Sequence, residues 1–599
     1  MKKILCALIP LMLLIGLSMP MLQKPKTIEA IHQEQIGHIP VLHNGRLKPL
    51  DSVARLSLIL IHGKQKLRLK DKQLNATQWL VDVLTRAEIA DQYPIFLIHN
   101  PDVKVFLGMR DLKKKMFSYA ELMPHLAQIH AQSQQVGQYT KKLWSPYQRA
   151  LISLKDHLML YSRLKNTLFS EYLFLDANHV LEEDKSIMMS HVPGSDGNDL
   201  AQLQEKYEFS SRVALFAPIA PLEGQSSEPE DWLNTGHSFM NFMQTKLFHP
   251  GLSAYAQLLD QYNTQDWPSL NETLNELNQT SNSELRQAYQ KARFEVLFND
   301  FEPFYKSVVL YLLSFILIIL SWLFWPKGLG RLAGNMLLLA FIIHTIGLIS
   351  RMVLQGRPPV TNLYASAVFV GWIAIFVSQI LEYFYKNRMG ILTASAIGFT
   401  TLIIAHHLSL SGDTLEMMQA VLDSNFWLST HVITVTMGYS GTFLAGFMGI
   451  AYILRGLFTT NFSAQEKQEA HSMVYGIVCF SLFFSFVGTA LGGIWADQSW
   501  GRFWGWDPKE NGALLIVLWN LIVLHSLKAR VIQTRGLMVS VIFGNIVTSF
   551  SWFGVNMLGV GLHSYGFMDK AFFWLISFIV TQILFMALGS LPLKIWRSQ

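Results

Sequence analysis

Nine apolar segments, each close to the length that crosses a lipid bilayer, occupy the second half of this 599-residue chain. A helix needs about 20 apolar residues to cross roughly 30 Å of hydrocarbon, and within the bilayer it must satisfy its own backbone hydrogen bonds. The chain is therefore predicted to be an all-α polytopic membrane protein. The segments are residues 307–325, 332–354, 364–385, 391–408, 431–454, 472–494, 512–527, 537–560 and 571–593. The segment 512–527 is shorter than the others, so its membrane-spanning helix is predicted to include residues on either side of it.

The distribution of charge agrees with a membrane protein. Charged residues make up 15% of the chain, against about 25% in soluble globular proteins. The formal net charge is +6, and the residues from 301 onward carry all of this excess, with 17 Lys and Arg against 11 Asp and Glu. A basic excess confined to the apolar half indicates membrane orientation, and no nucleic-acid partner is expected.

Basic residues predict which side of the membrane each segment end faces. Eleven Lys and Arg flank one set of alternating ends, and five flank the opposite set. The first set is expected in the cytoplasm. Residues 23–306 then face the outer side of the membrane, as Lys2 and Lys3 independently predict.

The chain is expected to have four parts. Residues 1–22 form a membrane anchor or a signal peptide, and no clear cleavage site follows them. Residues 23–306 form a mainly α-helical extracytoplasmic domain, in which Asn75 and the Ser118–Glu121 capping box predict helix starts. A linking transmembrane helix spans 307–325, and a membrane domain spans 331–593.

A tryptophan-rich segment, residues 495–510, is predicted to be an outer loop between two spans. Tryptophans at a membrane interface are common, so one interpretation is an aromatic belt. The alternative is a flat platform for a large planar ligand, since Gly501 and Gly505 lie between Trp500, Trp504 and Trp506. Arg502 and Lys509 could meet carboxylates on such a ligand.

Two histidines are predicted on the same outer face as the tryptophan-rich segment. His431 begins a span and His563 lies in an outer loop, and two imidazoles beside an aromatic platform are typical of a bis-histidine haem site. Either histidine alone is weak evidence. The only cysteines, Cys6 and Cys479, form no CxxC or CxxCH motif, so any thiol chemistry must involve another molecule.

Two further histidines, His344 and His525, lie inside apolar segments. Ionisable residues within the membrane are costly and often functional, although a single one often serves only to hydrogen-bond two helices. His525 is expected nearer the cytoplasm and His344 nearer the outer side. Their depths do not match well for a shared ligand.

Four motifs resemble a known family. Residues 500–510, WGRFWGWDPKE, resemble the WWD motif of haem-handling membrane proteins, and in particular the CcsA (ResC-type) component of System II cytochrome c biogenesis. The other three motifs resemble the early outer loop and the two outer histidine motifs of that family. They are residues 356–364, 427–432 and 561–565.

The resemblance implies a protein that binds haem b non-covalently and delivers it to the outer face of the membrane. There the haem would be attached to the CxxCH motif of apocytochrome c, which makes the chain part of a holocytochrome c synthase. The implied outer axial ligands are His431 and His563, and the haem-holding residues are Trp500, Trp504, Trp506 and Asp507. His525 would bind haem in transit, with His344 or a residue of a CcsB/ResB-type subunit as second ligand.

Other implied partners are apocytochrome c and thiol-reducing proteins on the outer side. Two other functions are compatible with the motifs. One is a System I haem-handling protein of the CcmF or CcmC type, which shares a WWD loop. The other is a haem exporter without an attachment step.

Overall fold

The computed structural model divides the chain into two compact units. One comprises Met1–Leu22, Phe301–Ser409 and Asp413–Gln599 and is called here the membrane unit; the other, Gln23–Asp300 with Leu410–Gly412, is called the 23–300 unit. The structure describes all residues except 1, 23–26, 71, 110, 141–142, 169–176, 191–197, 223–228, 279–282, 411, 417–423, 461, 558–568 and 599.

The 23–300 unit is mainly helical, as predicted, with three small antiparallel hairpins. Its helices are α2 (Ile28–Gly37), α3 (Leu50–His62), α4 (Ala76–Thr85), α5 (Ala87–Ala90), α6 (Pro101–Phe106), α7 (Tyr119–Leu122), η1 (Met123–His125), α8 (Leu126–Gly137), α9 (Pro146–Lys165), α10 (Ala177–Ser190), α11 (Asn198–Val213), η4 (Pro229–Asp231), α12 (Thr235–Thr245), α13 (Pro250–Thr264), α14 (Trp267–Asn278) and α15 (Ser283–Phe301). Its strands are β1 (Pro40–His43), β2 (Arg46–Pro49), β3 (Lys66–Arg68), β4 (Gln73–Asn75), β5 (Phe96–Leu97) and β6 (Met116–Phe117).

Local sequence explains several of these boundaries. Asn75 and Ser118 begin α4 and α7 as N-caps with reciprocal capping boxes, which confirms both predicted helix starts. Asn44 and Gly45 join β1 to β2 with positive φ angles of 51° and 71°, the geometry of a two-residue hairpin turn.

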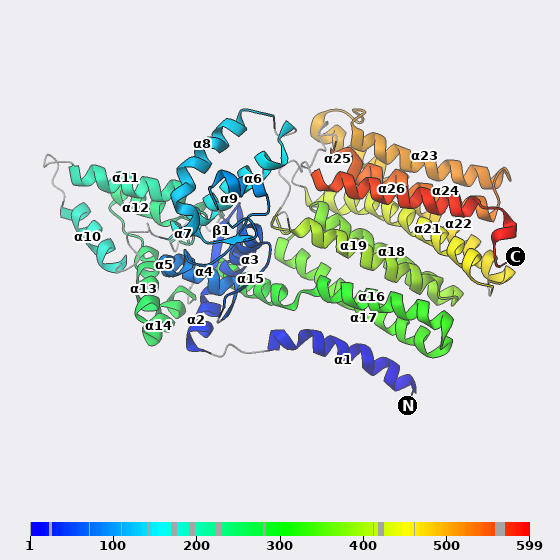
Figure 1. The fold of residues 1–599 in the computed structure, drawn as a ribbon, viewed down its shortest axis with the longest axis horizontal. Coiled ribbons are helices and arrows are strands. Elements are labelled where there is room, and N and C mark those ends of the chain that lie inside the picture. Colours follow the sequence, from blue (N-terminus) through cyan, green and yellow to red (C-terminus); the bar gives the residue numbers. More distant parts are fainter. Residues whose placement is uncertain are drawn as a thin grey trace. The chain divides into compact units, whose positions relative to one another are not determined.

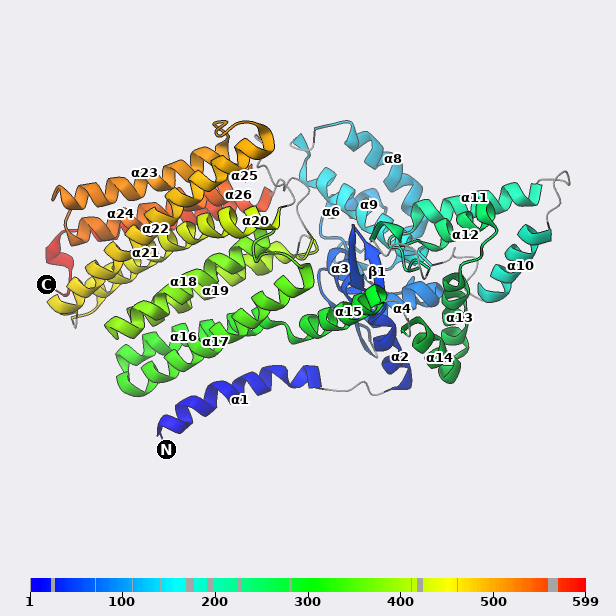
Figure 2. The ribbon, with the colours of Figure 1, turned by 180° about the vertical axis from the view of Figure 1, so that it is seen from behind.

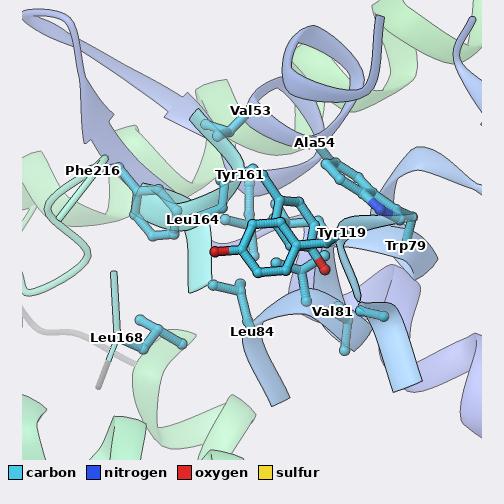
Figure 3. Close-up of a cluster of buried hydrophobic side chains, with 14 of the residues drawn as sticks. Val53, Ala54, Trp79, Val81, Leu84, Tyr119, Tyr161, Leu164, Leu168 and Phe216 are labelled. Carbon is cyan, nitrogen blue, oxygen red and sulfur yellow. The ribbon is translucent and has the colours of Figure 1, made fainter. Parts of the chain in front are cut away.

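Aromatic rings form the centre of the 23–300 core (Figure 3). Tyr119 and Tyr161 lie 4.9 Å apart between ring centroids, and the buried Trp79 ring is 6.5 Å from that of Tyr161. The Tyr161 hydroxyl and the buried Lys165 ammonium both donate to the Asp91 carboxylate at 2.8 Å. The polar ends of Tyr161 and Lys165 are therefore satisfied within the core.

The membrane unit is a bundle of long helices (Figures 1 and 2). Its elements are α1 (Lys2–Leu22), α16 (Pro303–Leu323), α17 (Pro326–Gln355), α18 (Leu363–Tyr385), α19 (Met389–Ser409), α20 (Asn425–Trp427), η5 (Leu428–Val432), α21 (Ile433–Phe458), α22 (Ala464–Trp500), α23 (Pro508–Lys528), α24 (Thr534–Ser549), η6 (Phe550–Gly554), α25 (Val555–Met557), α26 (Asp569–Ser590) and η7 (Leu593–Ile595).

Within the described residues, nine helices are long and apolar enough to cross a membrane, and they correspond to the nine predicted segments. The predicted fold class is confirmed. The span that contains α21 is the most enclosed, with 83% of its apolar window buried, whereas the corresponding window of α26 is 11% buried. Helix α21 is therefore central to the bundle and α26 is peripheral. Helix α1 lies against α17.

Helix α22 differs from its sequence-based prediction, because it continues to Trp500 instead of ending near residue 494. A capping box at Ser463 begins it, and Gly501, in the left-handed conformation at φ 68°, ends it. Its 37 residues extend about 55 Å, well beyond the hydrocarbon of a bilayer. Trp495 and Trp500 consequently lie on a helix, and the loop is confined to residues 501–507.

Candidate functional site: an aromatic cavity at one end of the membrane unit

One cavity, of about 210 Å³, lies at the end of the membrane unit where α18 begins and α22 ends. Its walls come from α18, η5, α21, α22, α23 and η6. The lining residues fall in 360–370, 428–439, 489–504 and 509–513, together with Trp552. These helix ends belong to the set that the charge distribution predicts on the outer side of the membrane.

His431 lies in this wall, within a π-helical turn, η5, that precedes α21. Single π-helical turns are rare and occur frequently at functional sites. The His431 Nδ1 atom is 2.8 Å from the Gly488 carbonyl oxygen of α22. Because a carbonyl can only accept, Nδ1 carries the proton in neutral imidazole, and Nε2 is the nitrogen with metal-binding character.

Glycines in α22 make room for the imidazole and its neighbour. A Cβ atom on Gly492 would lie 2.5 Å from His431 Cε1, and one on Gly493 would lie 2.5 Å from the Phe503 ring. Gly488 itself is so close to α21 that a Cβ would reach the Val435 backbone at 2.7 Å. Small residues of this kind allow close helix contact in membranes. The same contact brings the Gly488 carbonyl to His431.

Trp495 extends the wall beside His431, and Trp427 packs against Trp495. The Trp427 and Trp495 rings are stacked with centroids 6.2 Å apart, and Trp495 meets the His431 ring at 5.7 Å and 61°. Trp427 Nε1 donates to Gln498 Oε1 at 3.1 Å, which ties η5 and its neighbour α20 to the end of α22. The imidazole is thus enclosed on one side by an indole ring.

The three tryptophans predicted as a platform differ in whether they line the cavity. Trp500 and Trp504 line the cavity. The buried Trp504 Nε1 has no hydrogen-bond partner among the described residues, so the wall offers a donor. Trp506 is 69% exposed, has a φ of 56° and is not part of the wall.

Asp507 begins α23 as its N-cap. Its carboxylate accepts hydrogen bonds from the Lys509 and Glu510 amides, and the Glu510 carboxylate accepts from the Asp507 amide at 3.2 Å and the Gly505 amide at 2.8 Å. This reciprocal capping box closes the 501–507 loop onto the helix. Asp507 therefore holds the 501–507 loop against the start of α23, and it does not line the cavity.

Two more groups line the cavity: Trp552, which the sequence analysis did not select, and Lys509, which it considered only as a carboxylate partner. Trp552 lies in a second π-helical turn, η6, and donates from Nε1 to Ser366 Oγ at 3.0 Å. Lys509 Nζ donates to the Trp552 carbonyl oxygen at 3.0 Å, and both residues line the cavity. No tryptophan motif surrounds Trp552 in the sequence, so only packing shows that it belongs to the site.

The two intramembrane histidines do not meet. His344 is fully buried, with Nδ1 3.2 Å from Tyr311 Oη and its ring edge against Phe304. His525 lies on an exposed face of α23, and its Nδ1 is 2.8 Å from the Leu521 carbonyl oxygen. The pairing of His344 with His525 therefore has no support in the structure. His563 lies outside the described residues.

The fold defines an all-α polytopic membrane protein, and its described residues enclose an aromatic cavity bordered by a histidine. Comparison with known sequences is more specific: residues 360–563 match the family described as cytochrome C assembly protein. This segment includes the whole described cavity wall. This match, with the relatives named CcsA, confirms the resemblance found in the motifs.

Individual relatives agree with this assignment. Protein NrfI of Wolinella succinogenes is 29% identical over 65% of this chain, and the match covers 45% of NrfI. The cytochrome c biogenesis proteins CcsA of Vitis vinifera and Atropa belladonna are 26% and 29% identical. They match 40% and 39% of this chain and 87% and 86% of their own lengths. Because the NrfI match spans more of the chain than residues 360–563, that similarity extends beyond the assembly domain.

Proposed function

We propose that this protein acts in cytochrome c biogenesis of the System II type, and that its cavity holds haem at the outer face of the membrane. The observation that carries the proposal is His431: its Nδ1 meets a backbone carbonyl, its ring borders an aromatic cavity, and it lies within the assembly domain. A carbonyl-bonded imidazole is a well-oriented ligand for haem iron.

The rest of the cavity suits a large planar substrate. Trp495, Trp500 and Trp504 supply rigid apolar area, and the Trp504 Nε1 atom supplies a donor. The described part of the wall offers one imidazole. We assign the second axial position to His563, which follows in the sequence of the same domain.

The chemistry assigned to the protein is positioning. Attachment adds each cysteine S–H of a CxxCH motif across a haem vinyl group: the sulfur–carbon bond forms, the hydrogen goes to the other vinyl carbon, and no net oxidation occurs. Holding the macrocycle still while leaving its vinyl edge reachable lowers the entropic cost of this step. His431 holds the iron, and the tryptophans exclude water from the ring faces.

The proposed location is a bacterial cytoplasmic membrane, with the cavity and the 23–300 unit on the outer side. The proposed partners are apocytochrome c, outer thiol-reducing proteins and a CcsB-type subunit. The exposed His525 then faces lipid or that subunit, and haem in transit is the role we assign to it.

Single-cysteine variants test this orientation in a background without Cys6 and Cys479. Phe503 and Val531 are 51% and 76% exposed; Phe503 lies in the loop before α23, and Val531 follows the other end of this helix. In intact cells with a permeabilised outer envelope, an impermeant maleimide should label Phe503→Cys and leave Val531→Cys unlabelled until the inner membrane is lysed. Labelling of Val531→Cys but not Phe503→Cys in intact cells would contradict the proposed orientation.

Deletion of the gene tests the function. Cells without the protein should lose c-type cytochromes while retaining b-type cytochromes, and the wild-type gene but not His431→Ala should restore them. Unchanged c-type cytochromes would contradict the proposal. If deletion lowers only the amount of haem outside the cytoplasm, the protein is a haem exporter. If the cells contain an outer chaperone that carries covalently bound haem, the protein is of the System I type.

A further inference from the structure

Lys509 is the lysine in the described cavity wall, and its position is fixed. It is the second residue of α23, immediately after Pro508, and its ammonium is anchored by the Trp552 carbonyl at 3.0 Å. A cation near the start of a helix interacts unfavourably with the helix dipole, so helix stability gives no reason for a lysine here. The side chain nevertheless borders an otherwise mainly apolar cavity.

The acidic residues near Lys509 have other partners. Asp507 accepts from the backbone amides of Lys509 and Glu510. Glu510 accepts from the backbone amides of Gly505 and Asp507. Within the described part of the chain, no carboxylate lies at ion-pair distance from Lys509. The Asp507 carboxylate acts on the Lys509 ammonium only through space, and Glu510 lines the same cavity with its carboxylate bonded to backbone amides. The Lys509 ammonium can therefore still donate to an anionic group that enters the cavity.

Arg502, the other cation of the tryptophan-rich segment, has a different environment. A Cβ atom on Gly505 would lie 1.4 Å from Arg502 Nη1, so the guanidinium lies directly against the Gly505 backbone. Arg502 is not among the residues that line the cavity. The sequence suggested both cations as carboxylate partners, and the structure distinguishes them.

We propose that Lys509 is the residue that recognises a carboxylate of the planar ligand and thereby sets its orientation in the cavity. This inference rests on the proposed function. In haem the two carboxylates share one edge of the ring, and the vinyl groups lie away from that edge. Holding the carboxylate edge at the junction of α23 and η6 would leave the vinyl edge available for reaction.

Porphyrins with free and esterified carboxylates test this assignment. The full chain in lipid nanodiscs is titrated with zinc protoporphyrin IX and with its dimethyl ester, and binding is followed by porphyrin fluorescence against protein-free nanodiscs. A charge-assisted hydrogen bond corresponds to about 10- to 100-fold in affinity. The wild type should prefer the free acid by about that factor. Lys509→Gln should remove the preference, and Lys509→Arg should retain much of it.

Arg502→Gln is the matched control, because it removes a cation from the same segment outside the cavity. It should keep the preference of the wild type. A monodisperse elution profile confirms folding of each variant. An equal preference in the wild type and Lys509→Gln would overturn the inference while leaving the proposed function intact. Absence of porphyrin binding to the wild type would overturn both.

Discussion

The imidazole of His431 is positioned by two glycines of the neighbouring helix. The Gly488 carbonyl accepts its Nδ1 proton at 2.8 Å, and the missing side chain of Gly492 leaves space for its Cε1 edge. Both glycines lie on α22, one turn apart, so one face of this helix sets the tautomer and the position of the ring. Helix α22 therefore orients a ligand that it does not itself contribute.

A methyl group at position 492 should displace the imidazole. In Gly492→Ala the new Cβ would lie 2.5 Å from His431 Cε1, and α22 itself would tolerate alanine well. Loss of an orienting contact of this kind typically costs about 10- to 100-fold in metal affinity. Haem or zinc-porphyrin affinity should fall by that order, as measured by titration of the protein in nanodiscs.

Gly476 provides the control on the same helix. A Cβ atom there would meet nothing within 4 Å, so Gly476→Ala should bind like the wild type. Equal affinities for the two alanine variants would show that the space at Gly492 does not position His431.

Residue patterns located only part of the site. His431 and the tryptophans could be predicted because their residue types are unusual at the end of an apolar segment. Trp506 could not be separated from Trp504 by sequence, since the difference depends on the positive φ of Trp506. Gly492 and Gly493 are visible as an adjacent pair, but only packing shows which rings fill their space.

At the scale of elements, the ends of α22 and α23 determine the shape of the loop between them. Gly501 ends α22, and Asp507 with Glu510 begins α23, which leaves a loop of seven residues. The extension of α22 could have been predicted, because no glycine or proline interrupts the chain between Ile494 and Trp500. The π-helical turns η5 and η6 gave no comparable sequence signal.

The two possible roles of Asp507, helix cap and ligand contact, predict different mutant behaviour. As an N-cap it can be replaced by asparagine, whereas alanine should cost about 1 kcal/mol of stability. We expect Asp507→Asn to keep the unfolding midpoint and porphyrin affinity near wild type, and Asp507→Ala to lower both. Tryptophan fluorescence during heating in nanodiscs measures the first, and titration the second.

A stable Asp507→Asn variant without porphyrin affinity would contradict the capping role. It would show that the carboxylate charge acts on the ligand directly. The corresponding change Asn75→Ala, at the N-cap of α4 in the 23–300 unit, controls for a general capping effect. It should lower stability without changing porphyrin affinity.

At the scale of the whole molecule, hydropathy was sufficient to predict the spans, because a bilayer permits few backbone conformations. Each predicted segment corresponds to a helix, and the short segment 512–527 gains residues at both ends in α23. Which side chains of different spans pack together was harder to predict. His344 is enclosed by Tyr311 and Phe304, and His525 is on an exposed helix face, which depth alone could not show.

Haem binding at His431 is the central proposal, and a visible absorption spectrum of the purified full chain is its decisive test. Spectra of the oxidised and dithionite-reduced protein, with pyridine haemochrome analysis, should be recorded for the wild type, His431→Ala and His431→Ala/His563→Ala. We expect an extractable b-type haem in the wild type, with a shifted spectrum in His431→Ala and no haem spectrum in the double variant. A folded wild type without haem, or the same spectrum in all three proteins, would contradict the proposal.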